Sequence, residues 1–240
     1  MQPGMALDDV LAPYASVDRS PTGACWVMAH MVGGLHGSAA VGGRVGALST
    51  APHANLFRLM RSLADVVLVG AETVRREGYG AVQQQGARAE REQSLLARLA
   101  IVTRSLDLDW SAKAFTNAAP PACTVVITCA DAPPDRLEVA RQAADVLIAG
   151  QDRVEPVEAM RRLGELGHRM VLCEGGPTWL GEVVAADLLD ELCLTIAPMM
   201  GGDPLPVSVS PVGAPLTRFA LQHVLTDGDT LFLRYERAHE

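Results

Sequence analysis

Short, uninterrupted apolar runs that alternate with helical patterns constrain the fold of this chain most strongly. Val66–Gly70 is apolar at every position, and such a strand is typical of a parallel sheet that is covered on both faces. The residues that follow, 71–77, predict a short helix. The same alternation along the chain predicts an α/β fold with a mainly parallel central sheet flanked by helices. The other strands of this sheet are predicted at residues 26–32, 99–103, 124–128, 146–149, 170–173 and 191–198.

Capping and periodicity predict three longer helices. Ser49 or Thr50 can cap a helix that begins near Pro52. Spacings of three and four residues place one apolar face on that helix. This face is expected to consist of Leu56, Leu59, Met60 and Leu63. Helical patterns also cover residues 135–142 and 155–166.

The last part of the chain shows a different pattern. Strands are predicted at residues 219–225 and 230–236, and the Asp227-Gly228 pair between them is a hairpin signal. We therefore expect antiparallel C-terminal strands on the otherwise parallel sheet. A polar stretch at 78–91 predicts a loop.

Length and charge limit the organisation and the partners. With 240 residues, of which 49% are hydrophobic, the chain can bury one large core, and no repeat or linker divides it. We expect a loose N-terminal lead at 1–24 and a single domain at 25–240. A net charge of −8 argues against a nucleic-acid partner, because phosphate contacts need clustered Lys and Arg.

Hydropathy and cysteine spacing predict whether the chain has a membrane segment, which compartment it occupies and whether it binds a metal. No 18-residue apolar run and no charged-then-apolar leader occur, so a soluble, cytoplasmic protein without a membrane partner is expected. The five cysteines lack C-x-x-C spacing, which predicts reduced, mostly buried thiols and no metal site.

A glycine pair marks the first candidate site. The strand at 170–173 runs into Glu174-Gly175-Gly176-Pro177-Thr178 and then into a helix. Glycines let a ligand approach the backbone, and a helix start offers free N–H groups to phosphate. Pro177 suits the first helical position. The segment thus predicts a site for a nucleotide diphosphate, and the alternative is a turn that only ends a strand.

Two further strand ends carry suitable groups. Ligands of open α/β sheets bind at the carboxyl ends of the strands. Gly70 and Thr73 follow one strand, and Thr103 and Arg104 end another. Arg104 would pair with a terminal phosphate, unless it is an ordinary exposed loop arginine. The Glu174 carboxylate would be repelled by a pyrophosphate, so we expect its side chain to point elsewhere.

These motifs together resemble the reductase domain of the riboflavin pathway, the C-terminal half of the bifunctional pyrimidine deaminase–reductase. The similarity spans about residues 26 to 236. The matching segments are 64–74 (ADVVLVGAETV), 101–104 (IVTR), 172–178 (LCEGGPT) and 190–198 (DELCLTIAP), with Gly201-Gly202. Residues 75–79 (RREGY) add a likeness to stand-alone actinobacterial members of this family.

The resemblance implies a dihydrofolate-reductase-like fold, NADPH as hydride donor and reduction of a ribosylaminopyrimidine phosphate to its ribitylamino form. A small-molecule substrate and a homodimer are also implied. The cofactor would be bound by Gly70, Thr73, Thr103, Arg104, Glu174, Gly175, Gly176 and Thr178. Thr103 and Arg104 would lie near the adenosine 2′-phosphate and Gly175-Gly176 against the pyrophosphate. Arg61 would meet the substrate, as could Arg58.

The sequence departs from the family in two places. The zinc motif of the deaminase half is absent, and His53-Ala54-Asn55 lacks its Glu and cysteines, so only the reductase part is expected. The family's Ser-Leu-Asp-Gly motif here reads Gly34-Leu35-His36-Gly37. His36 thus replaces an aspartate that faces the substrate, which makes it the candidate catalytic residue, with Gly34 beside it; otherwise it is a solvated loop residue. His30 is expected to be buried and hydrogen bonded.

Three functions stay open on the sequence. The first is the pyrimidine reductase, and the second is a reductase of dihydrofolate, a pterin or another C=N compound. The third is an NADP(H)-binding protein with little catalysis, which the loss of the family's aspartate would favour.

Overall fold

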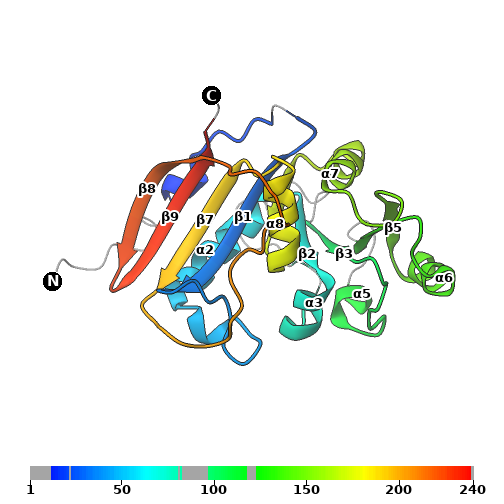
Figure 1. Cartoon of the computed structure of the whole chain (residues 1–240), viewed down its shortest axis with the longest axis horizontal. Coiled ribbons are helices and arrows are strands. Elements are labelled where there is room, and N and C mark those ends of the chain that lie inside the picture. The colour runs from blue at the N-terminus through cyan, green and yellow to red at the C-terminus, as the bar shows by residue number, and fades with distance from the viewer. Residues whose placement is uncertain (1–11, 22, 81, 83–96, 118–122, 239–240) are drawn as a thin grey trace.

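The computed structural model describes residues 12–21, 23–80, 82, 97–117 and 123–238, and the predicted loop at 78–91 lies mostly outside these. In the described residues, the strands form one nine-stranded sheet in the order β5-β4-β3-β2-β6-β1-β7-β9-β8 (Figure 1). The strands are β1 (Trp26–Gly34), β2 (Val66–Gly70), β3 (Arg98–Val102), β4 (Val125–Thr128), β5 (Asp145–Ile148), β6 (Met170–Cys173), β7 (Glu191–Ala197), β8 (Phe219–Asp227) and β9 (Thr230–Arg237).

The sheet has the predicted mixture of directions. All pairs from β5 to β7 are parallel, whereas β9 pairs antiparallel with both β7 and β8. The α/β fold with antiparallel C-terminal strands is therefore confirmed. β1 runs two residues beyond its predicted end, because Gly33 and Gly34 continue the ladder to Ile196 and Ala197 of β7. Glycine weakens a strand, but here the neighbouring strand decides the conformation.

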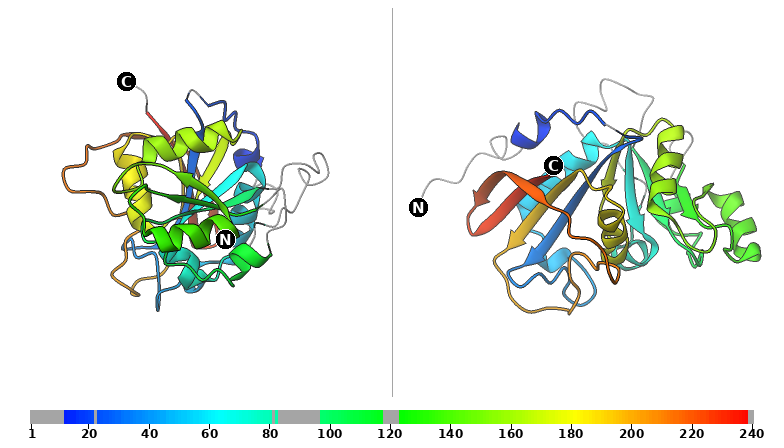
Figure 2. Two further views of the ribbon diagram at one scale, coloured as in Figure 1. Left: turned by 90° about the vertical axis from the view of Figure 1, so that its right-hand side faces the viewer. Right: turned by 45° about the horizontal axis from the view of Figure 1, so that its top comes forward.

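Helices cover both faces of the sheet. They are α2 (Ala51–Leu63), α3 (Ala71–Glu77), α5 (Lys113–Thr116), α6 (Pro134–Ala143), α7 (Pro156–Glu165) and α8 (Pro177–Ala185), with the 3-10 helix η1 (Gly46–Leu48). α7 and α8 pack with alternate residues of β1, β2 and β6 on one face, and α2 and α3 pack on the other. The left view of Figure 2 shows α8 and α2 on opposite sides of the strands. α5 and η1 were not predicted, since each is a single short turn.

α2 begins as its sequence predicts. The Thr50 side chain accepts a hydrogen bond from the N–H of His53, which caps the helix. Leu56 and Met60 are buried, whereas the predicted Leu59 and Leu63 are only half-buried. His53 takes the remaining buried position of this face.

The described part of the N-terminal lead packs on the domain and is not loose. Tyr14 is fully buried in the core beside α2. The Arg19 guanidinium donates to both carboxylate oxygens of Glu191 at 2.7 and 2.8 Å, and Arg234 pairs with the same carboxylate. A buried carboxylate such as Glu191 needs these partners, which explains why the segment is held.

The burial of the cysteines agrees with a further expectation. Cys25, Cys129, Cys173 and Cys193 are buried free thiols, and Cys123 is partly exposed. Among the described residues, no helix is both long and apolar enough to cross a membrane.

Candidate functional site

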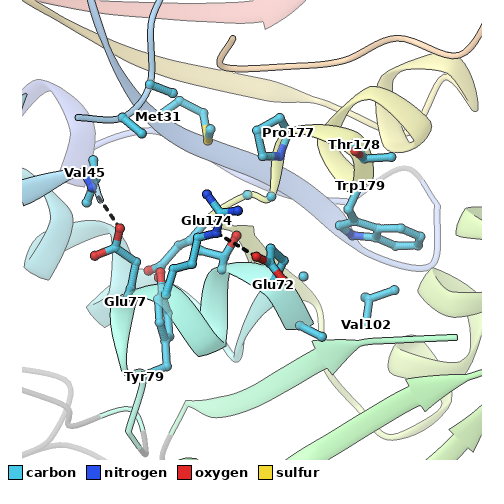
Figure 3. Close-up of a pocket in the computed structure, with 18 of the residues that line it drawn as sticks. Met31, Val45, Glu72, Glu77, Tyr79, Val102, Glu174, Pro177, Thr178 and Trp179 are labelled. Carbon is cyan, nitrogen blue, oxygen red and sulfur yellow. Dashed lines mark hydrogen bonds and ion pairs between the residues drawn. The ribbon is translucent and has the colours of Figure 1, made fainter. Parts of the chain in front are cut away.

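A cavity of about 920 Å³ lies at the carboxyl ends of β1, β2, β3 and β6. Figure 3 shows Trp179 and Val102 at one end of it and Val45, Glu77 and Tyr79 at the other. Parallel strands bring their carboxyl ends to one edge, where helix starts and loops supply the polar groups. The location is that of a ligand site in an open α/β sheet.

The ends of β2 and β6 are in direct backbone contact inside the cavity. The N–H of Gly70 donates to the carbonyl of Gly175 at 3.0 Å. A Cβ added at Gly70 would lie 3.3 Å from the nitrogen of Gly176, and one added at Gly176 would lie 3.1 Å from Oγ1 of Thr73. Gly175 has a φ of 97°, which only glycine adopts without strain. These positions therefore form a cradle that any larger residue would fill.

The start of α8 faces the same space. Gly176 is the N-cap and Pro177 the first residue, as predicted, and no side chain caps the helix. The first amides of an α-helix have no intrahelical partner, and its dipole favours a negative group there. Thr178 and Trp179 of this first turn line the cavity. The arrangement suits an anion such as a phosphate.

The end of β3 presents a cation at the edge of the cavity. Thr103 is buried, and its hydroxyl accepts a hydrogen bond from the N–H of Leu106 at 3.0 Å, which shapes the turn. Arg104, in this turn, is exposed and lines the cavity. It makes no ion pair with the residues that the structure describes. Its guanidinium is thus available to an anionic ligand.

Arg61 and Glu174 form a partly buried ion pair in the cavity wall. The Arg61 guanidinium donates to Oε1 and Oε2 of Glu174 at 2.7 Å each, and the Tyr79 hydroxyl donates to Oε2 at 2.8 Å. Burial alone would lower the pKa of Arg61, but the Glu174 carboxylate outweighs it and raises this pKa. Burial, and then the Glu174 charge, raise the pKa of Tyr79 well above its usual range. The Glu174 side chain is thus fully engaged by protein groups.

Two histidines occupy the inner part of the cavity. His30 of β1 and His53 of α2 are 3% and 5% exposed, and their rings lie 4.7 Å apart with planes at 34°. Nδ1 of His53 lies 3.0 Å from Oγ1 of Thr195. Neither ring nitrogen of His30 has a hydrogen-bond partner in the described residues. His30 is buried as expected, but the prediction that it is hydrogen bonded is wrong.

Both imidazoles are held neutral. Burial lowers the pKa of His53 to about 4. Burial, and then the neighbouring His53 and Arg61, lower the pKa of His30 well below 6.5. An unfolded chain would protonate these histidines near pH 6.5. The stability that they contribute is therefore complete above that pH and is lost as the pH falls toward 4.

We accordingly expect the free energy of unfolding to fall between pH 6.5 and 4, with His53 alone accounting for about 3 kcal/mol. Urea unfolding at a series of pH values measures this slope. Replacing both residues, His30→Leu with His53→Leu, should reduce this slope, and the lowered pKa values of His168 and His223 contribute to the slope that remains. The exposed His36, changed to Gln, is the control and should retain the wild-type slope. An unchanged slope in the double variant would show that other groups carry the acid sensitivity.

The cavity brings together most of the residues predicted for the site. They are Arg61, Gly70, Thr73, Thr103, Arg104, Glu174, Gly175, Gly176 and Thr178. The exposed Arg58 instead bonds to Asn55 and the Ala54 carbonyl. Gly34 and His36 are not among the residues that line the cavity.

The position of His36 follows from the turn after β1. The N–H of Leu35 donates to the carbonyl of Met199 at 2.8 Å, and that of Gly37 donates to the carbonyl of Gly34 at 2.9 Å. This turn leaves the His36 side chain exposed. The histidine therefore lies outside the cavity in this structure, and its predicted catalytic role stays a prediction.

Other cavity residues were missed by the sequence reasoning. Trp179 comes one residue after the predicted Thr178, and its position in the first turn of α8 could have suggested it. His53 lies three residues before Leu56 and seven before Met60, so the helical spacing could have placed it on the buried face of α2. Phe57 and Arg153 carry no comparable sequence signal.

Comparison with known proteins agrees with the geometry. The sequence profile of the RibD C-terminal domain matches residues 25–233. A 2,5-diamino-6-ribosylamino-4(3H)-pyrimidinone 5′-phosphate reductase of Methanothermobacter thermautotrophicus is 33% identical over 117 residues. The alignment covers 47% of this chain and 54% of the relative. About half the length of this curated relative is thus matched.

Two solved structures share the fold. A pyrimidine reductase-like protein of Corynebacterium diphtheriae superposes with a TM-score of 0.84 at 24% identity, covering 98% of this chain and all of the other. Dihydrofolate reductase from Enterococcus faecalis, complexed with NADP(H), gives a TM-score of 0.50 at 11% identity, covering 89% of this chain and 97% of the other. The dihydrofolate-reductase-like fold is thereby confirmed. The match to the profile extends over most of the sequence, and the chain belongs to the RibD C-terminal domain family.

Proposed function

We propose that this protein is an NADPH-dependent reductase that acts on a ribosylaminopyrimidine phosphate, the class of substrate named for its curated relative. The observation that carries the proposal is the cradle formed by Gly70, Thr73 and Gly176 at the start of α8, inside a cavity at the carboxyl end of the sheet. Membership of the RibD C-terminal domain family supports the same activity.

The residues of the cavity fit a dinucleotide phosphate. The bare backbone at Gly175 and Gly176 allows close approach of a pyrophosphate, and the first amides of α8 would donate to it. The Thr73 hydroxyl lies on the opposite wall of the cradle. When bound, NADPH would supply the hydride for the reduction. The protein contributes the groups that bind the cofactor and hold it in place.

Arg104 gives the proposed site its preference for a cofactor that carries a 2′-phosphate, NADPH, over NADH. Its exposed guanidinium at the end of β3 has no ion-pair partner in the described residues, and a guanidinium binds a phosphate through two parallel hydrogen bonds. Thr103 would act by fixing the turn, since its hydroxyl already accepts from Leu106. We assign Arg104 to the adenosine 2′-phosphate.

This assignment predicts the effect of Arg104→Ala. The variant should bind NADPH about 10- to 100-fold more weakly, because a charge-assisted bidentate contact is lost, while NADH binding should scarcely change. Fluorescence titration with each cofactor measures both constants. Arg141→Ala, which removes an exposed arginine of α6, is the matched control. Equal losses for the two cofactors would remove Arg104 from the 2′-phosphate.

The substrate would occupy the part of the cavity that is lined by Arg61, Glu174 and the two buried histidines. Oxidation of NADPH on addition of the ribosylaminopyrimidine phosphate, with dihydrofolate in a parallel assay, tests the proposed activity. An NADP(H)-binding protein without catalysis would bind the cofactor and oxidise it with neither compound. The homodimer and the cytoplasmic location stay predictions of the sequence.

A further inference from the structure

His53 is held in one orientation at the inner part of the cavity. The residue lies in the first turn of α2, which is fixed by the Thr50 cap, and its Nδ1 lies 3.0 Å from Oγ1 of Thr195 on β7. Thr195 is fully buried in the sheet. Because Nδ1 is used by this contact, Nε2 is the ring nitrogen of His53 that remains for a ligand. A hydrogen bond at one imidazole nitrogen sets the tautomer at the other.

His30 provides a second imidazole beside the first. Its ring lies against that of His53, and the Phe57 ring is 5.8 Å from His30 and 6.3 Å from His53. Both nitrogens of His30 are buried without a protein partner in the described residues. A buried polar group in this state is costly, and such groups in native proteins call for a specific explanation. The three rings form an aromatic cluster at this end of the cavity, with their planes tilted by 34° to 41° to one another.

We propose that His53 determines the substrate specificity of the cavity by hydrogen bonding, through Nε2, to the polar edge of the heterocyclic ring of the substrate. Thr195 is the positioning residue that fixes the His53 ring, and the buried His30 ring packs against it. The inference deepens the proposed function and rests on it for the identity of the substrate.

The charges around His53 favour a neutral ring over a phosphate. Both histidines are uncharged at neutral pH, because burial lowers the pKa of each. Arg61, which lines the same cavity, is already paired in two hydrogen bonds with Glu174. A phosphate placed here would have no counter-charge of its own, and burying such a charge is expensive. A planar heterocycle with N–H and C=O groups matches a neutral imidazole and stacks on aromatic rings.

The test uses NADPH-loaded protein titrated calorimetrically with the ribosylaminopyrimidine phosphate. His53→Phe keeps a flat ring but removes the nitrogens, and it should weaken pyrimidine binding about tenfold or more while NADPH binding is unchanged. Thr195→Val keeps the strand and His53 but removes the hydroxyl. We expect it to weaken binding about two- to tenfold, and the ¹⁵N imidazole spectrum of His53 to change from one tautomer to a mixture. His223→Phe, on β8 outside the cavity, is the matched control.

Each outcome decides the inference. Wild-type affinity for the pyrimidine in His53→Phe would overturn it, as would equal losses of pyrimidine and NADPH binding in a folded variant. An unchanged tautomer and affinity in Thr195→Val would remove Thr195 as the positioning residue. Failure of the NADPH-loaded wild type to bind the pyrimidine would contradict the proposed function and overturn the inference with it. If the wild type binds the pyrimidine, a negative result with the His53 variant overturns only the inference and leaves the proposed function standing.

Discussion

Replacing Arg61 by Met should lower the free energy of unfolding by about 3–5 kcal/mol, because it leaves the buried Glu174 carboxylate without its counter-charge. The Glu174 side chain is only 1% exposed, and Arg61 donates two of the three hydrogen bonds that it accepts from side chains in the described part of the chain. The third bond, from Tyr79, is a single neutral donor and cannot replace a guanidinium. Urea unfolding at pH 7 measures the loss.

A second substitution distinguishes the effect of the missing counter-charge from the effect of the lost Arg61 side-chain contacts. In the double variant Arg61→Met with Glu174→Gln, the buried charge is gone, so most of the lost stability should return. Arg161→Met is the matched control: its ion pairs with Glu158 and Glu165 lie in water on α7, and its removal should leave unfolding essentially unchanged. An equal loss in the single and double variants would mean that Arg61 stabilises the fold through its contacts with Phe57 and Tyr79 instead.

The second large effect is expected from Gly176→Val, which should reduce NADPH affinity by about 100-fold or more while the protein stays folded. A Cβ at this position would lie 3.1 Å from the Thr73 hydroxyl, and the two methyl groups of Val would fill the cradle proposed for the pyrophosphate. The N-cap conformation itself, with φ −58° and ψ 164°, is one that valine can adopt. The variant should therefore lose NADPH affinity while it keeps its folded structure.

Gly23→Val is the control for this variant. Gly23 precedes β1 at the amino ends of the strands, away from the cavity, and an added Cβ would meet nothing within 4 Å. Fluorescence titration with NADPH, together with far-UV circular dichroism, compares the two variants with the wild type. Wild-type NADPH affinity in Gly176→Val would refute the placement of the pyrophosphate.

The fold and the strand-to-helix turns that line the cavity were predictable because they depend on local sequence. β2 and α3 have the predicted bounds, since an apolar run that ends in Gly70 and continues as a helical pattern specifies both elements. The segment from Met170 to Thr178 likewise combines a buried strand, two glycines and a proline that starts a helix. Parallel pairing then brings these strand ends together at one edge of the sheet.

The part of the cavity that contains Arg61, Glu174 and the two buried histidines was less predictable, because it depends on contacts between distant residues. Arg61 and Glu174 are 113 positions apart, and neither local sequence indicates that the two side chains pair. His53 and Thr195 are separated by 142 positions. His36 was predicted as the catalytic residue because it departs from the family's motif. The turn that follows β1 leaves its side chain exposed, and the histidines that line the described cavity are His30 and His53.

The transfer of a hydride from NADPH to the sugar carbon of the ribosylaminopyrimidine phosphate tests the central claim most directly. NADPH carrying deuterium at the transferable position of the nicotinamide would be mixed with wild-type protein and this substrate, and the product would be analysed by mass spectrometry. We predict a ribitylamino product that is heavier by a single deuterium on the carbon that was the anomeric carbon of the ribose, with no transfer to dihydrofolate. Tight binding of NADPH without any labelled product would contradict the proposed reductase activity.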